Sequence, residues 1–142
     1  MKFGISLIVA IGLLFAATTV NAKESVDGTW KLTAGEANGK PLSEVDLKDG
    51  KLVIKGDHYN VTLHGQGTRT GVQKLNSDSK IHTIDITDTS GPHKGKTSHG
   101  IFQIIGDKFH VTFAPPGKPR PETLATQPET GYWSHIWERV TQ

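Results

Sequence analysis

The sequence predicts an all-β protein, an eight-stranded antiparallel up-and-down barrel with one short helix after the first strand. From Trp30 onward, apolar and polar residues alternate with period two, which is typical of strands with one buried face. Turn-forming residues separate eight such runs, and most of the links between them are short. A meander of that many strands has two exposed edges, which it removes by closing on itself.

The eight expected strands follow one another along nearly the whole chain after residue 27. They cover Gly28–Ala34, Lys51–Lys55, His58–Leu63, Thr68–Leu75, His82–Thr87, His99–Ile105, Lys108–Ala114 and Trp133–Val140. Between the first two lies KPLSEVDLKDG, residues 40–50, which has room for one or two helical turns. That is too short for a layer of helices against the sheet.

Alternation also predicts which side chains face inward. This set consists of medium and large apolar residues, namely Trp30, Leu32, Leu52, Ile54, Tyr59, Val61, Leu63, Ile84, Ile86, Phe102, Ile104, Phe109, Val111 and Phe113. Outward positions are mostly Lys, Thr, Asn, His and Gln, although Val53, Ile101 and Ile105 are apolar. An eight-stranded barrel with such an interior either fills with its own side chains or holds one small ligand.

The connections predict two unlike ends of the barrel. Tight turns at Gly56-Asp57, Asn76–Lys80 and Gly106-Asp107 share one end, and the other end carries residues 35–50, 64–67, 88–98 and 115–132. Three of these last connections are long. Long loops in a small domain are either binding segments and lids or tolerated surface insertions.

Gly28-Thr29-Trp30 resembles the Gly-x-Trp signature of lipocalins and their calycin relatives. In those families an arginine late in the last strand packs across the tryptophan and plugs the closed end, and Arg139 occupies the matching place here. The phrases GTWKL, NGKPL, KLVIKGD, GPHKGKT and FAPPGKPRP also resemble an uncharacterised planctomycete family of small secreted lipocalin-like domains. This resemblance spans nearly all of residues 23–142. It implies a lipocalin-like (calycin) barrel in an exported protein and no known activity, cofactor or catalytic residue.

Residues 1–22 have the pattern of a secretory signal peptide. Lys2 supplies a positive charge, an apolar core runs from Ile5 to Phe15, and Val20-Asn21-Ala22 precedes the expected cleavage point. The apolar run is shorter than the roughly 20 residues that cross a membrane. We therefore expect residues 23–142 to form one secreted or periplasmic domain with no membrane span after cleavage. The chain has no cysteine, so this domain cannot use disulfides.

Two features of the sequence indicate whether a nucleotide or a nucleic acid is an expected partner. Residues 90–98, SGPHKGKTS, end like a phosphate-binding Walker A loop. However, only three residues separate Gly91 from Gly95, and a strand pattern follows where the phosphate site needs a helix. The formal net charge of +2 is close to balance and does not indicate a nucleic-acid-binding surface. We expect neither partner.

The sequence contains residue types that bind metals or catalyse reactions, but not in a pattern typical of either kind of site. The chain has seven histidines, yet it has no HxH pair and no HExxH motif. Ser98, His99, Asp85 and Asp88 are residue types suited to nucleophilic or acid–base chemistry, but no GxSxG elbow or paired-carboxylate spacing organises them. We expect no metal, no cofactor and no catalytic residue, and so not an enzyme.

The leading hypothesis is a barrel that binds a small, mostly apolar molecule in its interior. The expected ligand-binding residues are Leu63, Ile86, Phe102, Phe113, Trp133 and His135, and the expected mouth rim is His93, Lys94, Lys96, Lys118 and Arg120. A cationic rim over an apolar interior would suit an anionic amphiphile such as a fatty acid, although acids at the same end would offset it.

The alternative hypothesis is a non-enzymatic interaction or envelope-associated module with a filled barrel that acts through its loops. The proline-rich segment FAPPGKPRPETLATQPETG, residues 113–131, is central to it. This segment either offers a docking ridge to a protein partner or simply makes a long connection rigid.

Overall fold

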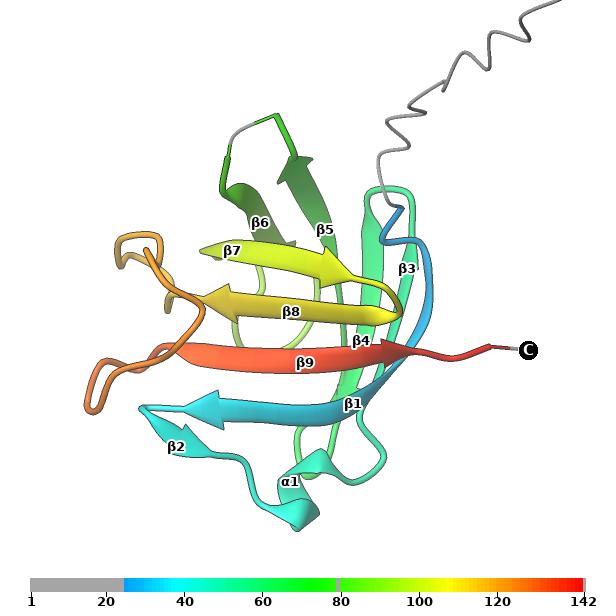
Figure 1. Ribbon diagram of the computed structural model, residues 1–142, viewed down its shortest axis with the longest axis horizontal. Coiled ribbons are helices and arrows are strands. Elements are labelled where there is room, and N and C mark those ends of the chain that lie inside the picture. Colours follow the sequence, from blue (N-terminus) through cyan, green and yellow to red (C-terminus); the bar gives the residue numbers. More distant parts are fainter. Residues whose placement is uncertain (1–24, 79, 142) are drawn as a thin grey trace, which may run out of the picture.

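The computed structural model describes residues 25–78 and 80–141, so the predicted signal peptide lies outside the described residues. The described chain forms a closed antiparallel eight-stranded barrel with one extra short strand (Figure 1). The strand order is β2-β1-β3-β4-β5-β6-β7-β8-β9, and pairing between β1 and β9 closes the barrel. The fold class predicted from the sequence is confirmed.

The strands observed match the expected ones closely. They are β1 (Gly28–Ala37), β3 (Lys51–Lys55), β4 (His58–Leu63), β5 (Gly67–Asn76), β6 (His82–Asp88), β7 (Thr97–Ile105), β8 (Lys108–Phe113) and β9 (Trp133–Arg139). The largest difference is at the end of β1, which reaches Ala37 rather than Ala34 because it pairs with the start of β9 as far as Trp133. The extra strand β2 (Lys40–Pro41) folds back on that end of β1.

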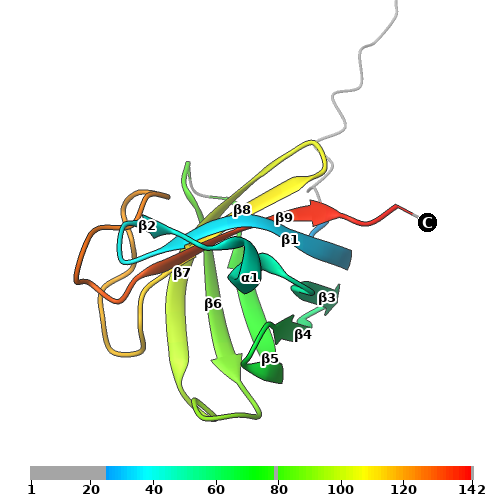
Figure 2. The ribbon, with the colours of Figure 1, turned by 90° about the horizontal axis from the view of Figure 1, so that it is seen from below.

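The short helix α1 (Glu44–Leu47) follows β2, at the place predicted. Ser43 caps it, accepting a hydrogen bond from the Asp46 backbone N–H, while the Asp46 carboxylate accepts one from the Ser43 backbone N–H. Leu47 packs against the core cluster. The helix therefore covers part of the barrel beside β1 (Figure 2) rather than forming a layer of its own.

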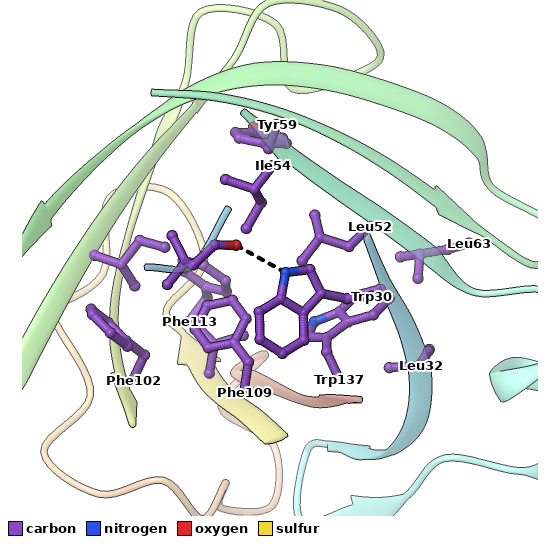
Figure 3. Packing of buried hydrophobic residues seen from close by; sticks show 13 residues of the cluster. Trp30, Leu32, Leu52, Ile54, Tyr59, Leu63, Phe102, Phe109, Phe113 and Trp137 are labelled. Carbon is purple, nitrogen blue, oxygen red and sulfur yellow. Dashed lines mark hydrogen bonds between the residues drawn. The ribbon is translucent and has the colours of Figure 1, made fainter. Parts of the chain in front are cut away.

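Several aromatic residues belong to the buried core cluster (Figure 3). Trp30, near the start of β1, and Phe109, near the start of β8, place part of this cluster at the end of the barrel that has the tight turns. Trp30 is fully buried and its indole Nε1–H donates to the Val26 carbonyl oxygen at 2.9 Å. The Phe109 ring packs against it at a centroid distance of 5.5 Å. The Arg139 guanidinium lies 4.2 Å from the Trp30 ring centroid and donates to the backbone carbonyl oxygen atoms of Asp27 and Ser25. Arg139 thus stacks on Trp30 as the lipocalin resemblance implied.

The proline-rich segment lies outside the barrel, beside β7 (Figure 2). Thr112 faces outward on β8 yet is fully buried, because the segment covers it and its hydroxyl donates to the Leu124 carbonyl oxygen at 2.6 Å. Ile101 shares a hollow with residues 122–124 and is 4% exposed. This explains why an apolar residue stands at an outward position of β7. Val53 and Ile105, the other two such residues, are exposed.

Candidate ligand cavity

The barrel contains a cavity of about 410 Å³. Its wall consists of residues of β1 and of β3 to β9, and residues of the long connections, including His93, Pro115, Pro116 and Gly131, complete it. The cavity therefore extends to the end of the barrel that carries the long loops. Its volume falls within the range of small-molecule sites, about 300–1,000 Å³.

Five of the six residues expected to contact a ligand line this cavity, namely Leu63, Ile86, Phe113, Trp133 and His135. Phe113 and Trp133 are register partners on β8 and β9, with ring centroids 5.5 Å apart. They form one aromatic part of the wall near the open end.

The sixth residue, Phe102, was predicted to contact the ligand, but it lies away from the cavity wall. Phe102 faces inward, but it does not line the cavity and packs instead against Phe109, at a centroid distance of 5.7 Å, and against His82, at 5.3 Å. Its register partner His82 is the first residue of β6, next to a tight turn. Alternation predicts the face of a strand residue but not its depth along the barrel, and Phe102 lies in the packed end.

The five residues of the predicted rim occupy three different places. His93 lines the cavity, so the connection between β6 and β7 does reach its mouth. Lys94, Lys96 and Lys118 are exposed and form no part of the cavity wall.

Arg120 is not at the mouth, and the expectation that it joins the rim is corrected. Its guanidinium contacts the Asp85 carboxylate at 2.7 Å and donates to the carbonyl oxygen atoms of Gly100 at 2.7 Å and Ile84 at 3.2 Å. Asp85 lies in the middle of β6 and points outward, because Ile84 and Ile86 on either side of it line the cavity. Arg120 therefore holds the proline-rich segment against the outer wall.

His99 completes this outer-wall cluster. Its Nδ1 lies 2.7 Å from Asp85 Oδ1. Burial works to raise the pKa of Asp85, but the hydrogen bonds from His99 and Arg120 outweigh it, and the pKa is lowered. Ser98 lines the cavity on the opposite face of the strand. Ser98 and His99 are adjacent on a strand and point to opposite faces, so they do not form a nucleophile–base pair.

The cavity wall also holds a polar cluster that the sequence reading missed. Tyr59, Gly71 and Asp88 are register partners in a row across β4, β5 and β6. The Tyr59 hydroxyl passes over Gly71 and donates to the Asp88 carboxylate. A Cβ atom at Gly71 would overlap that hydroxyl, so the glycine is what lets Tyr59 reach Asp88. Burial, and next the hydrogen bond to Asp88, raise the pKa of Tyr59 above its usual range.

Arg69 is the cationic member of the cluster. It lies two residues before Gly71 on the same face of β5, and its Nη1 is 3.8 Å from Asp88 Oδ2. Its Nη2 is 3.5 Å from Gln66 Oε1, a long contact. The Arg69 side chain is 22% exposed and that of Asp88 is 11% exposed. A guanidinium and a carboxylate thus face the same cavity at a distance longer than a hydrogen bond.

Gln73 and His135 are two further polar residues of the cavity wall. Gln73 is 8% exposed, and in the part of the chain that the structure describes its Nε2 has no hydrogen-bond partner. Burial, with a smaller contribution from the charge of Arg69, lowers the pKa of His135 to about 4. His135 is therefore neutral at neutral pH, and it packs edge-on against the Trp137 ring.

The sequence pattern indicates the positions of the cluster of Tyr59, Arg69 and Asp88 only weakly. Asp88 has the same parity as Ile84 and Ile86 and so faces inward. On β5, the inward residues are Arg69, Gly71 and Gln73, whereas the apolar Val72 points the other way. A strand whose inward face is mainly polar does not reveal its orientation through hydrophobic alternation.

Within residues 25–78 and 80–141, no group of three or more His, Asp or Glu side chains is placed to hold a metal ion. The same ranges contain no helix with the length and apolar character needed to cross a membrane. No protein-family model and no curated protein matches this chain. The resemblance to the planctomycete family therefore stays a prediction.

Proposed function

We propose that this protein is a non-enzymatic binding protein that carries a small, mostly apolar molecule in its barrel. The observation that supports this most strongly is the cavity of about 410 Å³, reached from the end with the long loops. Its wall is mostly aliphatic and aromatic, with a few polar groups at defined positions. This is the composition of small-molecule sites in general. The exported setting belongs to the same proposal and rests on the pattern of residues 1–22.

Burial of the apolar part of the ligand would supply most of the affinity. Each buried methylene contributes about 0.8 kcal/mol, which corresponds to roughly a fourfold change in the dissociation constant. The exposed lysines near the mouth would add little, because exposed ion pairs contribute about 0–1 kcal/mol each. Affinity should therefore depend on chain length far more than on salt.

The filled-barrel interaction module is less well supported, for two reasons. The cavity leaves room that a filled barrel would lack. The proline-rich segment also uses its polar atoms within the protein: the Thr126 hydroxyl accepts from the Gly39 N–H at 2.8 Å, and the Pro119 carbonyl oxygen accepts from the Tyr132 hydroxyl at 2.7 Å. These contacts support a rigid connection rather than a docking ridge.

The test is a titration of the folded protein with straight-chain alcohols of increasing length, followed by 1H–15N spectra. We expect saturable shifts at cavity residues such as Ile86 and Trp133, with affinity rising by about fourfold per methylene until the chain fills the cavity. Ile86→Phe should weaken binding by filling the cavity. The same substitution at Ile105, which is 67% exposed, is the matched control and should not.

A well-dispersed spectrum that no alcohol perturbs would contradict the proposal. The filled-barrel module would then be the better reading. Equal weakening by Ile86→Phe and Ile105→Phe would place the binding surface outside the cavity.

A further inference from the structure

We propose that the cavity selects an uncharged ligand, an apolar chain that ends in a hydroxyl or primary amide held between Arg69 and Asp88, and discriminates against carboxylates and ammonium ions. This inference rests on the proposed function, since it names the ligand class of the same cavity. It also departs from the anionic amphiphile that the rim lysines suggested.

The first support is the charge balance of the wall. Of the Asp, Glu, Lys and Arg side chains in the described residues, only Arg69 and Asp88 line the cavity. They lie on the same part of the wall, with Arg69 Nη1 and Asp88 Oδ2 3.8 Å apart. The wall also contains two histidines, His93 at the mouth and His135 on β9. Burial keeps His135 neutral, so it adds no positive charge near neutral pH.

A charged ligand group would gain little from this pair. A carboxylate close enough to bind Arg69 is also close to Asp88, so attraction and repulsion largely cancel. An ammonium group meets the same balance with the signs reversed. Either ion still pays the cost of leaving water, which is large when it is not offset by an opposite charge. An uncharged polar group avoids most of that cost.

The second support is unused hydrogen-bonding capacity. The separation of 3.8 Å between Arg69 and Asp88 exceeds the usual N–H···O range of about 2.7–3.2 Å. Tyr59 donates to Asp88 Oδ1, and within residues 25–78 and 80–141 no side chain donates a hydrogen bond to Asp88 Oδ2, which can therefore accept one from a ligand. A hydroxyl beside the pair can accept from Arg69 and donate to Asp88 Oδ2 at the same time. A carboxylate can only accept, and an ammonium can only donate.

Gln73 is a further uncharged polar group of the wall. It lies two residues after Gly71 on the same inward face of β5, on the opposite side of Gly71 from Arg69. Its Nε2 is a buried donor with no partner in the described residues. A primary amide or hydroxyl can pair with an amide side chain that offers both a donor and an acceptor. The wall thus presents Arg69 and Asp88 to the polar end of the ligand, and Gln73 offers a separate uncharged position further along β5.

The experiment compares four eight-carbon probes by calorimetry at neutral pH and moderate salt. Octanamide and octanoate form one pair with the same alkyl chain, and 1-octanol and octylamine form a second pair. We expect the neutral probe of each pair to bind at least tenfold more tightly than its charged partner. Octanoate or octylamine binding as tightly as the neutral probes would overturn this inference and leave the proposed function intact. If none of the four binds the folded protein, both fall.

Two variants make the charge balance itself testable. Asp88→Asn leaves Arg69 uncompensated, so octanoate should bind at least tenfold more tightly than to the wild type. Arg69→Gln leaves Asp88 uncompensated, so octylamine should gain instead. The double variant should prefer neutral probes again. Unchanged octanoate binding by folded Asp88→Asn would overturn the proposal. If a variant does not fold, the comparison of the four probes with the wild-type protein remains the test.

A control variant separates the cavity from the rim. Substitution of Lys94, Lys96 and Lys118 by glutamine removes three exposed cations that are not part of the wall. We expect less than a twofold change for all four probes. If this variant loses octanoate binding while Asp88→Asn leaves it unchanged, the head group lies at the rim and the inference is wrong.

Discussion

The substitution Gly71→Ala tests how the polar part of the cavity wall is built. Tyr59, Gly71 and Asp88 are register partners on three successive strands, and the Tyr59 hydroxyl crosses over Gly71 to reach Asp88. A Cβ atom at Gly71 would overlap both that hydroxyl and the Thr87 carbonyl oxygen. No positive φ angle is involved, so the cost comes from crowding alone.

The protein has two ways to accommodate the alanine. If Tyr59 stays, the crowded site costs about 1–3 kcal/mol, as overpacking generally does. If Tyr59 moves away, its hydrogen bond to a charged carboxylate is lost, which costs about 1.5–3 kcal/mol. Replacing glycine also lowers the entropy of the unfolded chain, which returns about 0.4–1 kcal/mol. The mid-range values give an expected net loss of about 1.5 kcal/mol in the free energy of unfolding.

Urea unfolding followed by tryptophan fluorescence measures this loss, with Lys74→Ala as the control. Lys74 is an exposed residue of the same strand, and its substitution should change stability by less than about 0.5 kcal/mol. Gly71→Ala should also alter the 1H–15N resonances of Asp88 and its neighbours. If Gly71→Ala costs no more than Lys74→Ala and leaves those resonances in place, the proposed route of Tyr59 over Gly71 is refuted.

Three further predictions concern the rest of the barrel. Trp30→Ala should lower the free energy of unfolding by about 3–5 kcal/mol, and Arg139→Ala should lower it by less. Because the two side chains are in contact, strictly additive losses in a double-mutant cycle would contradict the stacked plug. The pKa of His135 falls from 6.5 to about 4 on folding, so between these pH values the unfolded chain binds a proton that the folded chain does not. The free energy of unfolding should therefore fall by up to about 3 kcal/mol from pH 6.5 to 4. His135→Leu should reduce that slope in urea titrations at each pH, and an identical slope would argue against a buried neutral histidine. Arg120→Ala should release the proline-rich segment from Asp85, and a protease should then cut within residues 115–131 faster while the barrel stays folded. An unchanged rate of cleavage would contradict the anchoring role of Arg120.

The strands were predictable because the local signals agree. Alternation, β-branched and aromatic residues, and turns such as Gly56-Asp57 and Gly106-Asp107 all indicate the same boundaries, which the structure matches within three residues at every end. β2 was not predicted, since two residues, Lys40 and Pro41, are too few to show a period. Its pairing depends on the reversal at Asn38 and Gly39, a tertiary feature of the β1 end.

The cavity was harder to predict than the strands. Parity correctly places Ile86 and Trp133 on the inner face, but the depth of Phe102 depends on the barrel's stagger, which no single strand reveals. Arg120 was expected at the mouth because loop residues were assigned by topology alone. Its outward anchor on Asp85 depends on how the segment packs over Thr112, which the sequence pattern does not contain.

The most direct test of the central claim is a set of intermolecular nuclear Overhauser effects between 1-octanol and the folded protein. If the ligand lies in the cavity, its methylene protons should show contacts to the side chains of Ile86, Phe113 and Trp133, and its hydroxyl end should perturb the side-chain N–H resonances of Arg69. Contacts confined to exposed residues such as Ile105, or a saturable titration with no contact to any cavity residue, would contradict the account.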